Sequence, residues 1–279
     1  MTFRSRWSIL MYSAAVTLLI VLAAVTMILP ILWLLSTSLK SGETIFATPP
    51  SLIPRDPTLD NYRYVLESGD VPRYIGNSIV VSLLSVALNL ALSALVAYPL
   101  ARMRFRGRKT VFIAILATMI VPFQSIMLPV FLITKQLGLV NTPVGVVLPT
   151  AVTAFGVYLL RQAFLAIPVE LEEAARIDGC NEFVIWYRIM VPLIKPSLAT
   201  LAIITFTTTW SDFLWPVIVL QNPDKFTLTV GIQYFMSMLT SNWQHISAVS
   251  VIAVLPTVAL FLLLQKYFYA GTLSGSIKG

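Results

Sequence analysis

The sequence predicts an all-α protein that crosses a membrane several times. Of its 279 residues, 57% are hydrophobic and only 11% are charged, and the mean hydropathy is +0.84. Soluble domains average about a quarter charged residues. The charges also lie far apart, which leaves apolar runs of about 20 residues or more, the length a helix needs to cross a bilayer.

Six segments have this length, and we expect each of them to form a transmembrane helix: 9–36, 74–101, 110–133, 143–161, 198–220 and 247–265. The first follows Arg4 and Arg6, as a secretory signal would. Its apolar run reaches about Ser36, however, and a cleaved signal has an apolar core of roughly 7–15 residues. We therefore predict an uncleaved first span.

The basic residues predict the orientation. With the N-terminus in the cytoplasm, thirteen of the nineteen Lys and Arg residues lie on cytoplasmic segments, and five of these fall in the run RMRFRGRK (102–109). Cytoplasmic loops of membrane proteins carry such an excess of positive charge. We expect both termini to be cytoplasmic.

Two further segments lie outside the six spans. The Pro-rich stretch 40–72 is expected to form ordered turns and then a short helix on the outer side. The uncharged stretch 226–243 has the length of a seventh span, but it is rich in Thr, Ser, Gln and Asn. We favour an amphipathic segment at the outer face, because a seventh span would place Lys266 and Lys278 outside. The expected domains are 1–72, with the first span and the outer loop, and 73–279, with the other five spans.

A charged insert, 167–197, interrupts the apolar sequence between the fourth and fifth spans. We expect a short helix at 168–178, because Pro168 suits a first helical turn and Gly179 suits the left-handed position that ends a helix. The acidic side chains near its start favour the positive end of the helix dipole; they are Glu170, Glu172 and Glu173.

A second helix, 182–190, is expected to follow, with Asn181 as its cap and Pro192 as its stop. From the residues alone, the insert is either a solvated surface loop or a docking element. For docking, the small residues Ala174, Ala175 and Gly179 would fit a groove on another protein, and the acids would pair with its basic residues.

The pattern Glu173-Ala174-Ala175, Gly179 and Pro192 closely resembles the EAA loop of bacterial ATP-binding-cassette importer permeases, and Asp178 stands before the glycine. The resemblance implies a type I permease fold with six helices. It also implies that the loop is a coupling helix held in a cleft of a separate ATPase subunit, with Glu173 and Asp178 as polar anchors.

Two other stretches resemble the carbohydrate branch of that family. TTTWSDFLWPVIVL (207–220) is similar to a Trp- and Pro-containing stretch of carbohydrate permeases, although Ser211 replaces the usual Asn. QKYFYAGTLSGSIKG (265–279) is similar to the tail of the maltose-type second permease subunit. This implies that the cytoplasmic tail 271–279 contacts the ATPase; the expected contact residues are Gly275, Lys278 and Gly279. Permeases for sn-glycerol-3-phosphate are close relatives and stay open as an alternative.

The resemblance also implies the partners. They are a second permease subunit, a dimer of ATP-binding subunits and an extracytoplasmic solute-binding protein, assembled in the bacterial cytoplasmic (inner) membrane. The chain has no phosphate-binding loop and no metal-ligand pattern. ATP and Mg²⁺ are therefore expected on the partner ATPase, and the chain is expected to be a transport subunit rather than an enzyme.

The candidates for a substrate path are Gln124, Trp210 and Asp212. Asp212 is the only acid within an expected span, and ionisable residues inside a membrane usually serve a function. It could instead form a hydrogen bond between helices. An ion-coupled secondary carrier is the rival class, but such a carrier needs ion-binding groups at mid-membrane, and only Asp212 qualifies.

Overall fold

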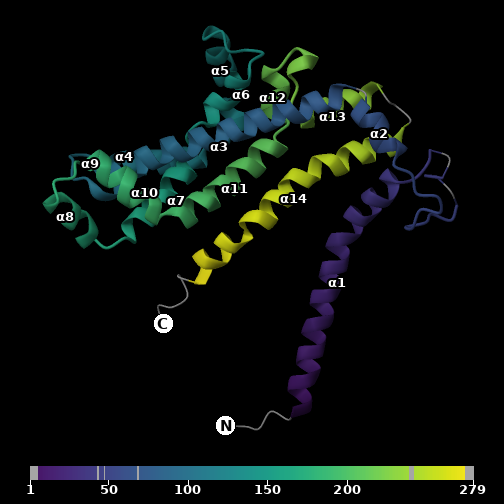
Figure 1. Cartoon of the computed structure of the whole chain (residues 1–279), viewed down its shortest axis with the longest axis horizontal. Coiled ribbons are helices and arrows are strands. Elements are labelled where there is room, and N and C mark those ends of the chain that lie inside the picture. The colour runs from purple at the N-terminus through teal and green to yellow at the C-terminus, as the bar shows by residue number, and fades with distance from the viewer. Residues whose placement is uncertain (1–5, 43, 47, 68, 239–241, 274–279) are drawn as a thin grey trace. The chain divides into compact units, whose positions relative to one another are not determined.

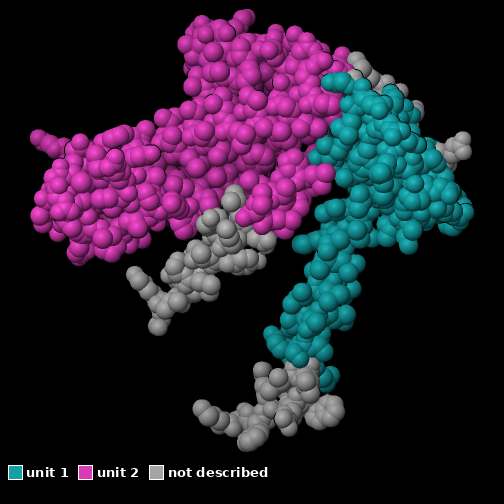
Figure 2. All heavy atoms as spheres, viewed as in Figure 1, with its two compact units in different colours: residues 1–69, 235–252 teal, residues 70–234, 253–279 magenta. Residues whose placement is uncertain are grey.

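The computed structural model describes residues 6–42, 44–46, 48–67, 69–238 and 242–273, and these residues form helices and connecting turns with no strand. The predicted all-α class is therefore confirmed. The chain divides into two compact units (Figure 2). Unit 1 comprises Met1–Gly69 and Phe235–Ile252, and unit 2 comprises Asp70–Tyr234 and Ala253–Gly279. The division at residue 72 that we drew from the sequence stays a prediction.

Unit 1 contains a long apolar helix and an ordered outer loop. Helix α1 is Arg6–Ser38, and the short helix α2 is Asp60–Glu67. The side-chain amide of the buried Asn61 donates to the carbonyls of Ser38 and Lys40, at 2.8 and 2.9 Å, and so ties α2 to the end of α1. The turns and short helix expected within 40–72 are present.

Six stretches have the length and composition of a span when each bent pair of helices is counted as one. Three are single helices: Met11–Ser38 within α1, α3 (Asp70–Arg102) and Trp243–Leu263 within α14 (Trp243–Leu273). The other three are bent pairs: Arg108–Ile120 with Phe123–Gln136, Pro143–Thr150 with Ala154–Leu165, and Glu182–Leu193 with Lys195–Ser211. Helices therefore lie in all six expected regions, but three of these regions contain two helices at a sharp angle and not one straight span.

Local chemistry explains two of these breaks. The expected helix 110–133 bends by 103°, because Pro122 has no N–H to donate and forces Val121 before it into an extended conformation, with ψ 114°. The expected helix 143–161 bends by 52°, because Thr153 begins a new helix there. The Thr153 hydroxyl accepts from the N–H of Gly156 at 3.0 Å, as an N-cap does.

The expected helix 198–220 begins earlier and ends earlier than predicted. Helix α11 is Lys195–Ser211, and Asp212 has an extended backbone with ψ 127°. The stretch 226–243 contains α13 (Leu228–Met238), which has 11 residues and is too short to cross a bilayer; residues 239–241 lie outside the described part of the chain. The choice of a non-spanning segment agrees with this length.

Helix α3 is the centre of unit 2 and packs against α7 and α11 (Figure 1). One face of α3 is buried and small or polar at successive turns: Ser78, Ser82, Ser85, Asn89, Ser93, Ala97 and Ala101. Small side chains let helices approach closely in a membrane, where apolar burial alone does not drive their association. Because the side chains on this face are small, α7 and α11 can pack closely against α3 although its sequence has no wide apolar stripe.

The two ends of α3 contact different loops. Near its start, Asn77 donates from Nδ2 to the carbonyls of Asp224 and Phe226, both at 2.9 Å. Its last residue, Arg102, contacts Glu172 in the charged insert. Since α3 has 33 residues, it is about 50 Å long at 1.5 Å per residue.

The remaining elements of unit 2 are short or belong to the bent pairs: α4 Arg108–Ala117, η1 Thr118–Ile120, α5 Phe123–Gln136, α6 Pro143–Val147, η2 Leu148–Thr150, α7 Ala154–Leu165, α8 Glu170–Ile177, α9 Glu182–Val184, η3 Ile185–Met190, α10 Val191–Leu193, α12 Leu214–Val219 and η4 Pro223–Lys225.

Candidate functional site

The charged insert begins with the short helix α8, which ends at a glycine as predicted. Gly179 has φ +83°, a conformation that side chains with a Cβ rarely adopt. Its N–H donates to the Arg176 carbonyl at 3.1 Å, and the N–H of Cys180 donates to the Ala175 carbonyl at 3.0 Å. These two bonds form the Schellman motif, which satisfies the last carbonyls of a helix. The observed helix, Glu170–Ile177, is slightly shorter than the predicted 168–178.

The two faces of α8 differ in burial. Glu172 and Ala175 are buried, and Ala175 packs into a core that joins α3, α7 and the insert. Glu173, Ala174, Asp178 and Gly179 are all exposed. The Glu-Ala-Ala triplet therefore places Glu173 and Ala174 on the outer face, while Ala175 holds the helix to the spans.

The second half of the insert confirms the cap and corrects the stop. Asn181 accepts from the N–H of Val184 at 2.9 Å through Oδ1, so it caps the second helix. Pro192 was expected to end that helix, but the helix continues to Leu193 and Pro192 lies exposed within its last turn. A π-helical stretch, η3 (Ile185–Met190), comes directly before it.

The π-helical turns give a physical reason for this difference. In an α-helix, a proline lacks a hydrogen bond and clashes with the carbonyl four residues earlier. Here the N–H of Val191 bonds to the carbonyl of Trp186, five residues earlier. A wider turn of this kind is a recognised adjustment at helix irregularities. The chain turns at Ile194 instead, between Leu193 and Lys195.

Buried and exposed charges surround α8. Arg102 Nε lies 2.9 Å from Glu172 Oε1, and these two side chains are 7% and 3% exposed. The contact is ionic, because its angles are not those of a hydrogen bond. Burial raises the pKa of the Glu172 carboxyl, and the charges of Arg102 and Arg176 oppose that rise. The sequence showed both residues but not this contact, since no spacing rule connects residue 102 to residue 172.

The outer surface of the insert combines acids with exposed apolar side chains. Ile177, Phe183 and Tyr187 are 87%, 65% and 61% exposed. Exposed apolar patches with a polar rim mark sites where proteins bind each other. Helix α8 itself is charged, with three acids in its first turn and Arg176 in its last, so the surface around Ile177 fits a protein partner.

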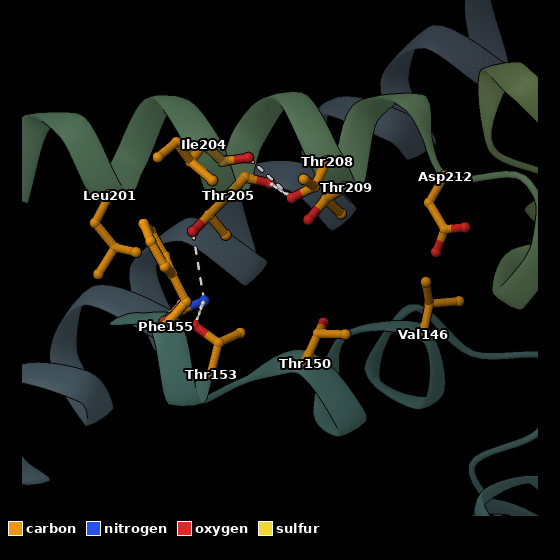
Figure 3. A pocket seen from close by; sticks show the side chains of 11 residues that line it. Val146, Thr150, Thr153, Phe155, Leu201, Ile204, Thr205, Thr208, Thr209 and Asp212 are labelled. Atoms are coloured by element: carbon orange, nitrogen blue, oxygen red, sulfur yellow. Dashed lines mark hydrogen bonds between the residues drawn. The ribbon is translucent and has the colours of Figure 1, made fainter. Parts of the chain in front are cut away.

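A second candidate site is a pocket of about 400 Å³ within unit 2, between α11 and the α6–α7 segment (Figure 3). Pockets that bind small molecules have volumes of about 300–1,000 Å³. Hydroxyl groups dominate its polar lining: Thr150, Thr153, Thr205, Thr208 and Thr209. Phe155 adds an aromatic face, and Asp212 lies at one end.

Asn89 links the two walls of this pocket. The side chain of Asn89 is buried, and its Nδ2 lies 3.3 Å from Thr153 Oγ1 and 3.4 Å from Thr205 Oγ1. A Cβ at Gly156 would lie 2.6 Å from Ser93 Oγ and 2.9 Å from Asn89 Oδ1, so only glycine fits there. The pocket can accept and donate hydrogen bonds to a hydroxylated solute.

The three substrate-path candidates have different positions. Asp212 lines the pocket, but its Oδ1 also accepts from the N–H groups of Leu214 and Trp215, at 3.1 and 3.5 Å, and so caps α12. Trp210 does not line the pocket. It is buried, and its indole N–H donates to the Ala253 carbonyl at 2.8 Å. Gln124 is exposed near the start of α5, away from the pocket lining.

Helix periodicity explains the separation of Trp210 from Asp212. Thr205, Thr208 and Asp212 repeat at three and four residues and share one face of the chain, whereas Phe206 and Trp210 lie on another, where their rings stack at 5.5 Å. The Thr spacing was visible in the sequence and could have indicated the pocket.

The remaining predictions concern the tail and metals. Gly275, Lys278 and Gly279 lie outside the described residues. Within the residues that the structure describes, no three His, Cys, Asp or Glu side chains are grouped so that they could hold a metal ion.

Comparison with known proteins gives one family match. Residues 89–273 match the model of the binding-protein-dependent transport system inner membrane components. The matched range contains both the charged insert and the hydroxyl-lined pocket.

Individual relatives cover most of the chain. It is 40% identical to the arabinooligosaccharides transport system permease protein AraQ of Halalkalibacterium halodurans, over 86% of this chain and 85% of the relative. It is 33% identical to the lactose transport system permease protein LacG of Rhizobium radiobacter, over 92% and 93%. A chain of a bacterial ABC transporter that imports the acidic polysaccharide alginate is 28% identical, with a TM-score of 0.87, and the match covers 96% of this chain and 100% of that one.

Proposed function

Because this chain belongs to the family of binding-protein-dependent transport system inner membrane components, we propose that it carries a specific sugar or short saccharide into the cell as one subunit of an ATP-driven importer. The chain is a multi-pass membrane transport component and not an enzyme. It is a sugar-type permease by its similarity to AraQ and LacG. The identity of the solute, the partners and the coupling residues belong to the proposal.

The outer face of α8 is the observation that carries the coupling role. It presents the exposed Glu173, Ala174 and Asp178 beside the almost fully exposed Ile177, and Gly179 ends the helix there. A separate ATPase subunit would receive this face in a cleft, with the acids paired to basic residues and Ile177 removed from water. The tail residues Gly275, Lys278 and Gly279 would add contacts to the same partner.

The pocket supports a neutral, hydroxylated solute. Threonine hydroxyls and Asn89 match the hydrogen-bonding groups of a saccharide, and the lining contains no Lys or Arg. A phosphate is usually recognised by Arg or Lys, so the alternative solute sn-glycerol-3-phosphate is less well matched. Asp212 would repel it further.

The partners follow from the family and from what the chain lacks. We assign ATP and Mg²⁺ to a dimer of ATP-binding subunits, because the sequence has no phosphate-binding loop. A second permease subunit would complete the membrane part. The family description names a binding protein, and an extracytoplasmic solute-binding protein would deliver the sugar to the outer side.

The test is to co-express the chain with the ATPase, permease and binding-protein genes beside it, purify the complex and reconstitute it in liposomes. ATP-dependent uptake is then measured for arabinotriose, lactose and sn-glycerol-3-phosphate. Uptake of a saccharide that requires both ATP and the binding protein is the expected result. Uptake driven by an ion gradient without ATP would refute the proposal and favour a secondary carrier.

A further inference from the structure

Arg102 belongs to the basic run 102–109, whose expected role is to set the orientation of the chain. Its neighbours Arg104 and Arg106 are exposed, as this role requires. Arg102 differs, because its side chain is only 7% exposed and faces Glu172, which is 3% exposed. A role in orientation does not need a buried arginine, so this residue has a second use.

The contact joins the end of α3 to α8 directly. Arg102 Nε lies 2.9 Å from Glu172 Oε1, and Arg102 Nη2 also donates to the carbonyl of Ile167 just before α8. One guanidinium group thus holds both the first turn of α8 and the chain that leads into it. Arginine suits this geometry, because its planar group offers several donors in fixed directions.

A second set of contacts lies one helical turn away. Tyr98 on α3 donates to Glu182 Oε2 at 3.0 Å, and Arg176 on α8 donates to Glu182 Oε1 at 2.8 Å. Arg176 also lies 3.4 Å from Glu172 Oε2. Since Tyr98 and Arg102 are one turn apart on α3, and Glu172 and Arg176 are one turn apart on α8, the two helices are joined at two places.

Other contacts also hold the end of α3: Tyr98, Leu100 and Ala101 pack into the core that contains Ala175 of α8, and Arg161 donates to the Leu100 carbonyl at 3.1 Å. Pro99 lies within its last turn and cannot donate to the carbonyl four residues earlier. The contacts of Arg102 add a direct polar connection between the last turn of α3 and α8. Asn89 on the same helix lines the hydroxyl-lined pocket. It precedes Arg102 by 13 residues, or about 20 Å along the helix.

We propose that Arg102 and Glu172 are a positioning pair that transmits displacement of α8 to α3, and through α3 to the wall of the pocket. The proposal rests on the proposed function, in which an ATPase subunit moves α8. The Tyr98–Glu182–Arg176 contacts are the second point of attachment, which keeps α8 from rotating about the pair.

Stability alone is a weak reason for such a pair. A buried ion pair often contributes little net stability, since the cost of removing two charges from water offsets their attraction. Removal of one partner leaves the other buried without a counter-charge, whereas removal of both does not. A variant that lacks both charges can therefore separate transmission from folding.

The experiment measures movement at the pocket without the need for a known solute. Cys180 is the only cysteine in the sequence, so in a Cys180→Ser, Thr209→Cys background this chain has one thiol, at the pocket wall, and labelling is measured on this chain alone. The reconstituted complex is treated with a fluorescent maleimide, with and without ATP and vanadate. The change in labelling rate reports how far ATP binding and hydrolysis shift the pocket. If ATP does not change the labelling rate in this background, the proposed function is wrong. The variants are compared once ATP is seen to change the labelling rate of the background.

Three variants and one control are compared in this background. Arg102→Met, Glu172→Met and the double variant are expected to reduce the ATP-induced shift by roughly 2–30-fold, the usual range by which mutations change coupling between sites, while ATPase subunits still co-purify. Because the two residues act as one unit, the double variant is expected to lose about as much as either single variant. Arg106→Met removes a charge from the same basic run, at an exposed position, and is expected to keep the full shift.

Three results would overturn the proposal. The first is a full shift in the double variant. The second is a loss in the double variant equal to the product of the two single losses, which would mean that Arg102 and Glu172 act independently. The third is failure of the double variant to bind the ATPase subunits, which would give the pair a role in assembly alone.

Discussion

Asp212 shows how one residue can satisfy two different expectations. Its position within an apolar segment suggested a functional acid, and it does line the pocket. Its Oδ1 also accepts from the N–H groups of Leu214 and Trp215 in the first turn of α12, as a capping side chain does. To cap a helix, the side chain needs only an oxygen that accepts hydrogen bonds. To act on the solute through its negative charge, it must be a carboxylate.

Substitution separates the two roles. Asn is as good a cap as Asp, so Asp212→Asn is expected to keep the thermal stability of the purified complex. Asp212→Ala loses the acceptor and is expected to cost about 1 kcal/mol. If capping is the main role of Asp212, the Asn variant keeps both its stability and its saccharide uptake, and only the Ala variant loses both. An Asn variant that is stable but does not transport would assign the negative charge to the transport step.

Residues whose role depends on nearby backbone were predictable. Gly179 and Asn181 act through hydrogen bonds within three to five residues, so the sequence contained the whole argument for each. Glu172 and Trp210 were not predictable in the same way. The contact of Glu172 with Arg102 and that of Trp210 with Ala253 join positions distant in the sequence, and only the fold brings them together.

At the scale of helices, apolar length predicted where spans lie but not where they bend. Pro122 lies at the break between Arg108–Ile120 and Phe123–Gln136, where the chain bends by 103°. Pro192 was expected to end a helix, but a π-helical stretch before it lets the helix continue. The effect of a proline therefore depends on the geometry of the turns before it, which apolar length does not reveal.

The end of α8 allows a sharp test of docking. A Cβ at Gly179 meets no atom within 4 Å, so within this chain the only cost of a side chain is its left-handed conformation, about 1–2 kcal/mol. Gly179→Ala introduces this strain with little bulk. Gly179→Asn introduces bulk with little strain, because Asn tolerates the left-handed region. Gly179→Val introduces both.

We expect Gly179→Val and Gly179→Asn to reduce co-purification of the ATPase subunits and ATP-driven uptake, because bulk at this exposed position obstructs the fit to the partner. Gly179→Ala is expected to retain most of both activities. Normal amounts of the polypeptide in membranes would show that insertion is unaffected. If Ala is as harmful as Val while Asn is harmless, backbone strain rather than docking explains the glycine.

At the scale of the whole chain, the contacts at the two ends of α3 bear on orientation. The structure ties Asp224 to the start of α3 and Glu172 to its end, across a helix about 50 Å long. A bilayer with its headgroups is about 40–45 Å thick. We therefore expect the charged insert and the loop at Asp224 to lie on opposite sides of the membrane, as the six-span arrangement requires.

Reporter fusions test this arrangement. Fusions after Gly107 and after Lys195 are expected to be cytoplasmic, because the basic run and the charged insert lie at the Arg102 end of α3. Fusions near Asp60 and Asp224 are expected to be external. The strongest test is the fusion at Asp224, since α13 is too short to cross and α14 is expected to return the chain to the cytoplasm. A cytoplasmic reporter at Asp224 would place both ends of α3 on one side, which its length forbids for a spanning helix. The six-span orientation would then be wrong, and the outer face of α8 could not be assigned to a cytoplasmic ATPase.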